Sequence, residues 1–270
     1  MNLVENYAYI RESIASIKYL KKKYITNFYE NQKVVSSWID NKIFYTDSFE
    51  EVVFLFKKKR GFYNLYYIAA TTEAIENGLK LVLKENPKVF FVSDIITKTE
   101  KADVKAKFEN SGFYEYTSLM RMNRINQYNP DDYKPNNNTR LAALNEAGQI
   151  FKLLHKYFDP ISEQLPTKEK LLEWIDNENV LVYMNGKKVA GFIIYKLIGY
   201  SLYLKYWFVH PDYRDHGIGS KLFELFLYNG SDSKQQIFWV IRSNENAIKR
   251  YKHYGFKKDN LFDFVMTNKI

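Results

Sequence analysis

The stretch HPDYRDHGIGSKLFELFL, residues His210–Leu227, decides how this chain is interpreted. An apolar run, SLYLKYWFV at 201–209, precedes it, and an amphipathic helix pattern begins within it. Gly217 and Gly219 lie one residue apart at the start of that helix, although the chain has only 11 glycines among 270 residues. A strand, a glycine-bearing turn and a helix N-terminus bring backbone N–H groups together beside a partial positive charge, which binds phosphate. The stretch therefore predicts an anion-binding turn.

Two familiar phosphate loops do not match this turn. The dinucleotide fingerprint needs a third glycine at the position that Leu222 occupies, and a P-loop needs Gly-Lys-Ser/Thr, which is absent. By itself, Gly-x-Gly at a helix start also fits a plain tight connection between a strand and a helix. The interpretation therefore depends on a second motif.

The second motif is NENAIKRYKHYGF, which begins at Asn244. Ala247 and Tyr251 are four residues apart and share one face of the predicted helix, where alanine leaves room for a ligand beside a phenol. Gly255 and Phe256 follow the helix. The alternative for Tyr251 is a core aromatic residue, because the chain contains 23 tyrosines.

The two motifs together resemble the GNAT superfamily of N-acetyltransferases. Arg214–Gly219 reads R-x-x-G-x-G, and the segment from Asn244 reads N-x-x-A-x-x-x-Y-x-x-x-G-F, in the family's order. The resemblance covers the chain from about Thr139 to its C-terminus.

This resemblance implies an acyl donor, normally acetyl-CoA, and a role for each matching residue. Phe208 and Val209 would offer backbone groups to the pantetheine arm, Asn244 would contact the coenzyme, and Tyr251 would protonate the leaving thiolate as a general acid. The pyrophosphate would be cradled by the backbone amides of one continuous run: Arg214, Asp215, His216, Gly217, Ile218, Gly219 and Ser220.

The general base is open. Many members of this family carry a glutamate on the strand before the loop, but SLYLKYWFV contains no carboxylate. A base could come from Glu163, Asp159 or His155, in a segment that often forms the acceptor pocket, or ordered water could take the proton. Each of these three residues also fits an ordinary surface position.

The fold class expected is α/β with a mixed sheet, built from two tandem GNAT-like domains of which the first is degenerate. The boundaries expected are 1–126 for the first domain, 127–138 for a polar linker with Pro130 and Pro135, and 139–270 for the acetyltransferase domain. Phe108, Gly112 and Phe113 occupy the same register as Tyr251, Gly255 and Phe256, which indicates an internal duplication. The first half has no R-x-x-G-x-G and is not expected to bind coenzyme A in the family manner.

Composition narrows the remaining choices. The chain has no cysteine and four histidines, so disulfides and thiol nucleophiles are excluded and no metal site is expected. No signal peptide or membrane helix is predicted, which favours a cytoplasmic protein without a membrane partner. The net charge is +9, but the basic runs KYLKKKY (18–24) and FKKKRGF (56–62) are interpreted as solvated faces or helix ends, so a nucleic-acid partner is not expected.

The leading hypothesis is an N-acetyltransferase acting on a primary amine of a small molecule or peptide, as a monomer or homodimer. One alternative is a non-catalytic module that binds coenzyme A or a partner. Another is an aminoacyl transferase, because some proteins with paired domains of this fold have that activity. The sequence does not identify the acceptor.

Overall fold

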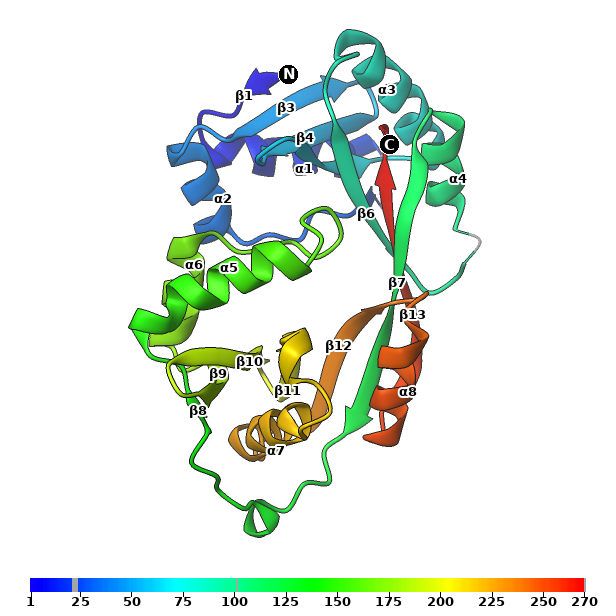
Figure 1. Ribbon diagram of the computed structural model, residues 1–270. Helices are drawn as coiled ribbons and strands as arrows, with labels where there is room; N and C mark the ends of the chain where they lie inside the picture. Colours follow the sequence, from blue (N-terminus) through cyan, green and yellow to red (C-terminus); the bar gives the residue numbers. More distant parts are fainter. Residues whose placement is uncertain (21–23, 101, 270) are drawn as a thin grey trace. The chain divides into compact units, whose positions relative to one another are not determined.

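The computed structural model describes residues 1–20, 24–100 and 102–269, which form two compact units (Figure 1). Unit 1 is Met1–Met120 with Asn260–Ile270, and unit 2 is Arg121–Asp259. Two strands, β7 (Tyr114–Ile125) and β13 (Lys257–Thr267), each pass from one unit into the other. The domain boundary predicted at 127–138 stays a prediction. That prediction did not include the assignment of the last strand, from Asn260 onward, to unit 1. The lysines at 21–23 of the first basic run lie outside the described residues.

Unit 1 contains a sheet in the order β1-β3-β4-β5-β6-β13, in which only β5 and β6 are a parallel pair. The helix α3 connects these two strands, as a parallel pair requires. The remaining elements of this unit are β1 (Asn2–Leu3), α1 (Tyr7–Leu20), β2 (Ile25–Thr26), α2 (Gln32–Asp40), β3 (Phe44–Phe49), β4 (Val52–Lys58), β5 (Tyr63–Ala69), α3 (Thr72–Glu85), β6 (Phe91–Thr97) and α4 (Asp103–Asn110).

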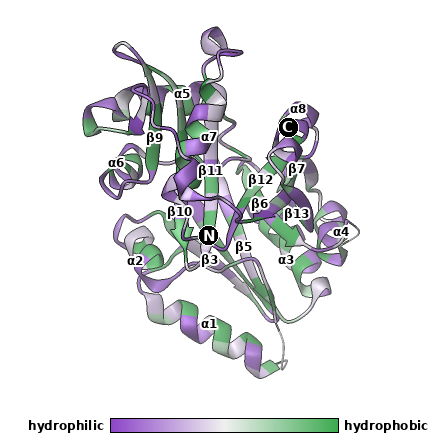
Figure 2. Cartoon of the chain, turned by 90° about the horizontal axis from the view of Figure 1, so that it is seen from below, coloured by the Kyte–Doolittle hydropathy of each residue, from purple (hydrophilic) through white to green (hydrophobic). Residues whose placement is uncertain are grey.

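The sheet of unit 1 is buried on both faces. Along β4, Val53 and Leu55 pack with residues of α1 and α2, whereas Phe54 and Phe56 pack with residues of α3. Successive side chains of a strand point to opposite faces, so a nearly continuous apolar run is what a strand between two helical layers needs. Figure 2 shows hydrophobic colour along the strands and mixed colour along α1.

Unit 2 has the strand order β12-β11-β10-β9-β8, and again one pair, β11 with β12, is parallel and joined by a helix. Its elements are β8 (Thr139–Leu141), α5 (Ala147–Tyr157), α6 (Lys168–Asp176), β9 (Val180–Asn185), β10 (Lys188–Ile198), β11 (Ser201–Val209), α7 (Ile218–Asn229), β12 (Gln235–Ile241) and α8 (Glu245–His253). A hairpin turn at Asn185-Gly186 joins β9 and β10, with Gly186 at φ 58°.

The predicted fold class is confirmed, and the turn after α4 has the same geometry as the turn after α8. After α4, the amide of Phe113 donates to the carbonyl of Phe108 at 3.1 Å, and Gly112 has φ 98°. After α8, the amide of Phe256 donates to the carbonyl of Tyr251 at 3.1 Å, and the intervening glycine is again left-handed. Glycine suits this turn because a Cβ disfavours positive φ.

One local expectation was wrong. The second basic run is not wholly solvated, because Lys57 lies in β4 with its ammonium 3.8 Å from the centroid of the Trp38 ring. Burial, together with the neighbouring Lys59 charge, lowers the pKa of Lys57 to about 8.

Candidate functional site

The strands β11 and β12 pair over a short distance and then separate. Their register covers only Ser201↔Gln235, Leu202↔Gln236 and Tyr203↔Ile237. On its other side, β11 stays paired with β10 as far as Val209. Among the described residues, one edge of β11 therefore pairs with no strand beyond Tyr203. The two residues predicted to meet the pantetheine arm, Phe208 and Val209, lie at the end of this strand. The edge beyond Tyr203 is called the open edge of β11 below.

The turn after β11 exposes a run of backbone amides. A short 3₁₀ turn, Pro211–Tyr213, leads into Arg214, and Asp215 and Gly217 then adopt left-handed backbone angles, φ 64° and 68°. Among the described residues, no acceptor engages the N–H groups of positions 215–220, whereas the amide of Lys221 donates to the carbonyl of Gly217 at 3.2 Å. Six consecutive free donors at the N-terminus of a helix of 12 residues form a positively polarised surface.

The two glycines of this turn have different surroundings. A Cβ added at Gly217 would meet no heavy atom within 4 Å, so the backbone there is open to a ligand. A Cβ at Gly219 would lie 3.6 Å from the Trp207 side chain, so this glycine lies against β11. The neighbouring side chains Arg214 and His216 are exposed.

One residue of this region was missed from the sequence. The hydroxyl of Tyr254 hydrogen-bonds to the hydroxyl of Ser220 at 2.9 Å, which ties the end of α8 to the first turn of α7. The ring of Tyr254 also contacts Phe223 and Trp207, with centroids 4.5 and 5.7 Å apart. The only available signal was an aromatic residue three positions after Tyr251, in a chain rich in tyrosine.

The helix α8 presents the two residues of the second motif differently. The side-chain oxygen of Asn244 accepts from the amide of Ala247 at 3.1 Å and thus caps α8. Tyr251 lies half-buried with its ring 4.0 Å from that of Phe238 and 5.7 Å from that of Trp207. Among the described residues its hydroxyl has no hydrogen-bond partner. Burial raises the pKa of Tyr251 to about 12, so the phenol is protonated at neutral pH.

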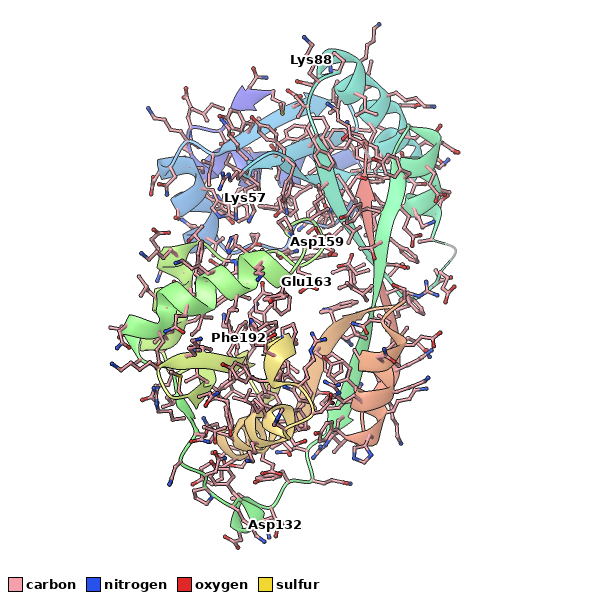
Figure 3. The ribbon with its side chains drawn as sticks, viewed as in Figure 1. Lys57, Lys88, Asp132, Asp159, Glu163 and Phe192 are labelled. Carbon is pink, nitrogen blue, oxygen red and sulfur yellow. The ribbon has the colours of Figure 1, made fainter. Side chains whose placement is uncertain are left out.

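Of the three candidate bases, His155 lies in α5. Asp159 and Glu163 lie in the loop that follows α5 (Figure 3). His155 is exposed, and its ring stacks on Phe151 at 4.0 Å. The carboxylate of Asp159 accepts from the amide and hydroxyl of Ser162 at 3.1 and 2.7 Å. Glu163 is half-buried, and burial with the nearby Asp159 charge raises the pKa of its carboxyl to about 7.

Unit 1 has the same strand separation, but its own chain closes it. The strands β5 and β6 pair only at Tyr63↔Phe91 and Asn64↔Val92. Beyond these pairs, the side-chain amide of Asn27 donates to the carbonyls of Leu65 and Asp94 at 3.4 and 3.1 Å. It also accepts from the amide of Tyr67 at 2.8 Å.

The turn that follows β5 also differs from its counterpart. Thr71 caps α3 by accepting from the amide of Ala74 at 3.1 Å, and its hydroxyl donates to the carboxylate of Glu51 at 3.4 Å. This turn has no glycine. The amide of Ala74 at the start of α3 is already bonded to Thr71, and the carboxylate of Glu51 lies beside the turn. Among the described residues, a run of free amides beside an open strand edge therefore occurs in unit 2 and not in unit 1.

Comparison with known proteins gives a family match in the second half of the chain. Residues 147–256 match the model of the acetyltransferase (GNAT) family. No curated protein matches the sequence significantly. Among the described residues, no helix has the length and hydrophobicity needed to cross a membrane, and no group of three or more histidine or acidic side chains could hold a metal ion.

Solved structures share the fold at low sequence identity. A GCN5-related N-acetyltransferase from Sphaerobacter thermophilus aligns with a TM-score of 0.59 at 12% identity, over 96% of this chain and 90% of that protein. A tandem GNAT protein from the clavulanic acid biosynthesis pathway aligns with a TM-score of 0.54 at 10% identity, over 80% and 78% of the two chains. A conserved protein of unknown function from Staphylococcus epidermidis aligns with a TM-score of 0.53 at 12% identity, over 74% and 82%.

Proposed function

Because residues 147–256 match the model of the acetyltransferase (GNAT) family, we propose that the protein transfers an acetyl group from acetyl-CoA to a primary amine. The observation that carries the proposal is the run of free backbone amides at 215–220, placed next to the open edge of β11. A pyrophosphate fits the first feature and an extended amide-bearing arm fits the second.

In this proposal the turn and the open edge of β11 bind the donor, and Tyr251 assists the leaving group. Acetyl-CoA supplies an acyl group already activated as a thioester. The turn and the open edge hold the donor in one orientation, and positioning of this kind can supply several kcal/mol of a barrier, roughly 7–11 in well-oriented systems. Tyr251 donates a hydrogen bond to the sulfur as negative charge develops on it. Its raised pKa, about 12, keeps that proton available throughout the neutral range.

The test is calorimetric titration of the purified protein with acetyl-CoA, comparing Gly217→Glu with Gly186→Glu. Both glycines are left-handed, at φ 68° and 58°, and a Cβ at either would meet no heavy atom within 4 Å. The two variants should therefore carry a similar backbone penalty of about 1–2 kcal/mol. Only Gly217→Glu places a carboxylate in the predicted phosphate site.

We expect the wild-type protein and Gly186→Glu to bind acetyl-CoA alike, and Gly217→Glu to lose binding. Equal binding by all three proteins would show that the turn does not hold the coenzyme. Binding without turnover of any amine would favour the alternative of a non-catalytic coenzyme A module.

A further inference from the structure

The loop between α5 and α6 is attached to the open edge of β11 by a side chain of the strand itself. Tyr206, which is 6% exposed, donates its hydroxyl to the backbone carbonyl of Glu163 at 2.8 Å. The same hydroxyl lies 3.3 Å from the carbonyl oxygen of Gln164, a residue with a left-handed backbone angle, φ 46°. The backbone of Glu163 is thus held beside the part of β11 that β12 does not cover.

The two carboxylates of this loop differ in what they contact. Asp159 accepts hydrogen bonds from the amide of Ile161 at 3.3 Å and from the amide and hydroxyl of Ser162 at 3.1 and 2.7 Å, so it organises the turn. The carboxylate of Glu163 makes no hydrogen bond or ion pair with any residue that the structure describes, although the side chain is half-buried. A half-buried carboxylate without a partner is costly for stability, which suggests another role.

The charged and titratable groups around Glu163 come from three elements: Asp159 from its own loop, Tyr206 from β11 and Tyr251 from α8. Burial is the main cause of the raised pKa of both tyrosines, and the negative charge of Glu163 raises each further. Tyr206 and Trp207 are neighbours in a strand, so their side chains leave it on opposite faces. The ring of Tyr251 packs on that of Trp207, so Glu163 and Tyr251 approach the open edge of β11 from its two faces.

We propose that Glu163 is the general base of this site and takes the proton from the acceptor amine opposite Tyr251. The inference rests on the proposed function. The acceptor enters as an ammonium ion and gives one proton to the Glu163 carboxylate, which passes it to solvent. The neutral nitrogen then forms a bond to the thioester carbonyl carbon and loses a second proton to solvent. The carbon–sulfur bond breaks, and the sulfur takes one proton from the Tyr251 hydroxyl, which is restored from solvent. The products are an amide, free coenzyme A and one released proton.

The structure explains why this carboxylate suits the task. A base works best when its pKa is near the operating pH, and the value for Glu163, about 7, meets that condition. A glutamate with an ordinary pKa, about 4.3, would be a weaker base. The carboxylate of Asp159 is already hydrogen-bonded within its own turn. The position on the α5–α6 loop replaces the carboxylate that β11 lacks.

The experiment compares two amine probes at saturating acetyl-CoA, with release of the coenzyme A thiol as the readout. 2-Phenylethylamine is a cation at neutral pH, since alkylamines have pKa values near that of lysine, about 10.4. O-Methylhydroxylamine is already neutral at pH 7 and needs no base before it attacks. We expect Glu163→Gln to lower kcat/KM for 2-phenylethylamine by about 100-fold or more, and for O-methylhydroxylamine by less than about 5-fold.

The pH profile gives a second readout that a merely structural role would not change. For the wild-type protein, kcat/KM with 2-phenylethylamine should fall as the pH drops through about 7, where Glu163 becomes protonated. Asp159→Asn keeps a side-chain oxygen for the turn but removes the like charge, so it should move this acidic limb to lower pH. Glu163→Gln should abolish the limb.

The outcomes separate the two proposals. An equal loss with both amines, or an acidic limb that persists in Glu163→Gln, would overturn the role of Glu163 while leaving acetyl transfer intact. Absence of thiol release from the wild-type protein with either amine would count against acetyl transfer itself, and the role of Glu163 would fall with it. Acetyl-CoA binding by Glu163→Gln, measured by calorimetry, should match the wild-type value.

Discussion

At the scale of single residues, Tyr251 is the side chain whose chemistry can be isolated most cleanly. Its hydroxyl has no partner among the described residues, so removing it breaks no internal hydrogen bond. We expect Tyr251→Phe to lower kcat by about 10- to 100-fold, a modest acid effect because a thiolate leaves readily. Steady-state kinetics with either amine probe measure this, and the dissociation constant for acetyl-CoA should stay within about 3-fold of the wild-type value.

Tyr254→Phe is the matched control for that change. It removes a phenol from the same helix end, but that phenol bonds to Ser220 in the first turn of α7 at 2.9 Å. The control should therefore weaken acetyl-CoA binding more than it lowers kcat. If Tyr251→Phe leaves kcat unchanged, the hydroxyl does not act as the acid.

The residues of the site were predictable to different degrees. Gly217 could be named as a candidate because the Gly-x-Gly spacing at the start of a helix, which lets a ligand approach the backbone, is visible in the sequence. From the sequence, Glu163 was one of three candidate bases with Asp159 and His155, and the sequence could not choose among them. The choice depends on the pKa, and a pKa depends on burial and on neighbouring charges that come from other elements. Tyr254 was missed because a single tyrosine among many carries no positional signal.

At the scale of elements, the segment around β2 closes in unit 1 the strand separation that stays open in unit 2. β2 pairs with β5 at Ile25↔Ala69 and Thr26↔Ile68, and Asn27 then bridges the separating strands β5 and β6. The repeat of helix, Gly-Phe and strand was readable from the sequence because it is local. The closure was not, because Asn27 bonds to Leu65 and Asp94, which lie 38 and 67 residues away.

Asn27→Ala should destabilise unit 1 strongly. The change leaves the amide of Tyr67 and the carbonyl of Asp94 without their side-chain partner in a part-buried region, which costs roughly 2–4 kcal/mol in sum. Asn31→Ala is the control, since it removes an exposed helix cap of α2 and should cost about 1 kcal/mol. Urea unfolding followed by circular dichroism measures both, and an Asn27→Ala effect no larger than that of Asn31→Ala would show that the bridge contributes little.

At the scale of the whole molecule, a repeated fold raises the question of how many coenzyme sites each chain has. We expect one. Both units contain a parallel strand pair that separates, but among the described residues only β11 and β12 leave the separation open and follow it with a turn of free amides. In unit 1 the same place is bridged by Asn27, and in the following turn Thr71 caps α3 and donates to the carboxylate of Glu51, which lies between β3 and β4. A phosphate there would meet a carboxylate and a helix donor that is already engaged.

Equilibrium dialysis with radiolabelled acetyl-CoA at concentrations well above the dissociation constant counts the sites directly. The wild-type chain should bind one molecule and Gly217→Glu none, with Gly186→Glu again binding one. Asn27→Ala should also bind one, because opening the strands of unit 1 does not create the amide turn that a pyrophosphate needs. Two molecules per wild-type chain, or one that persists in Gly217→Glu, would place a site in unit 1 and contradict the division of roles between the two units.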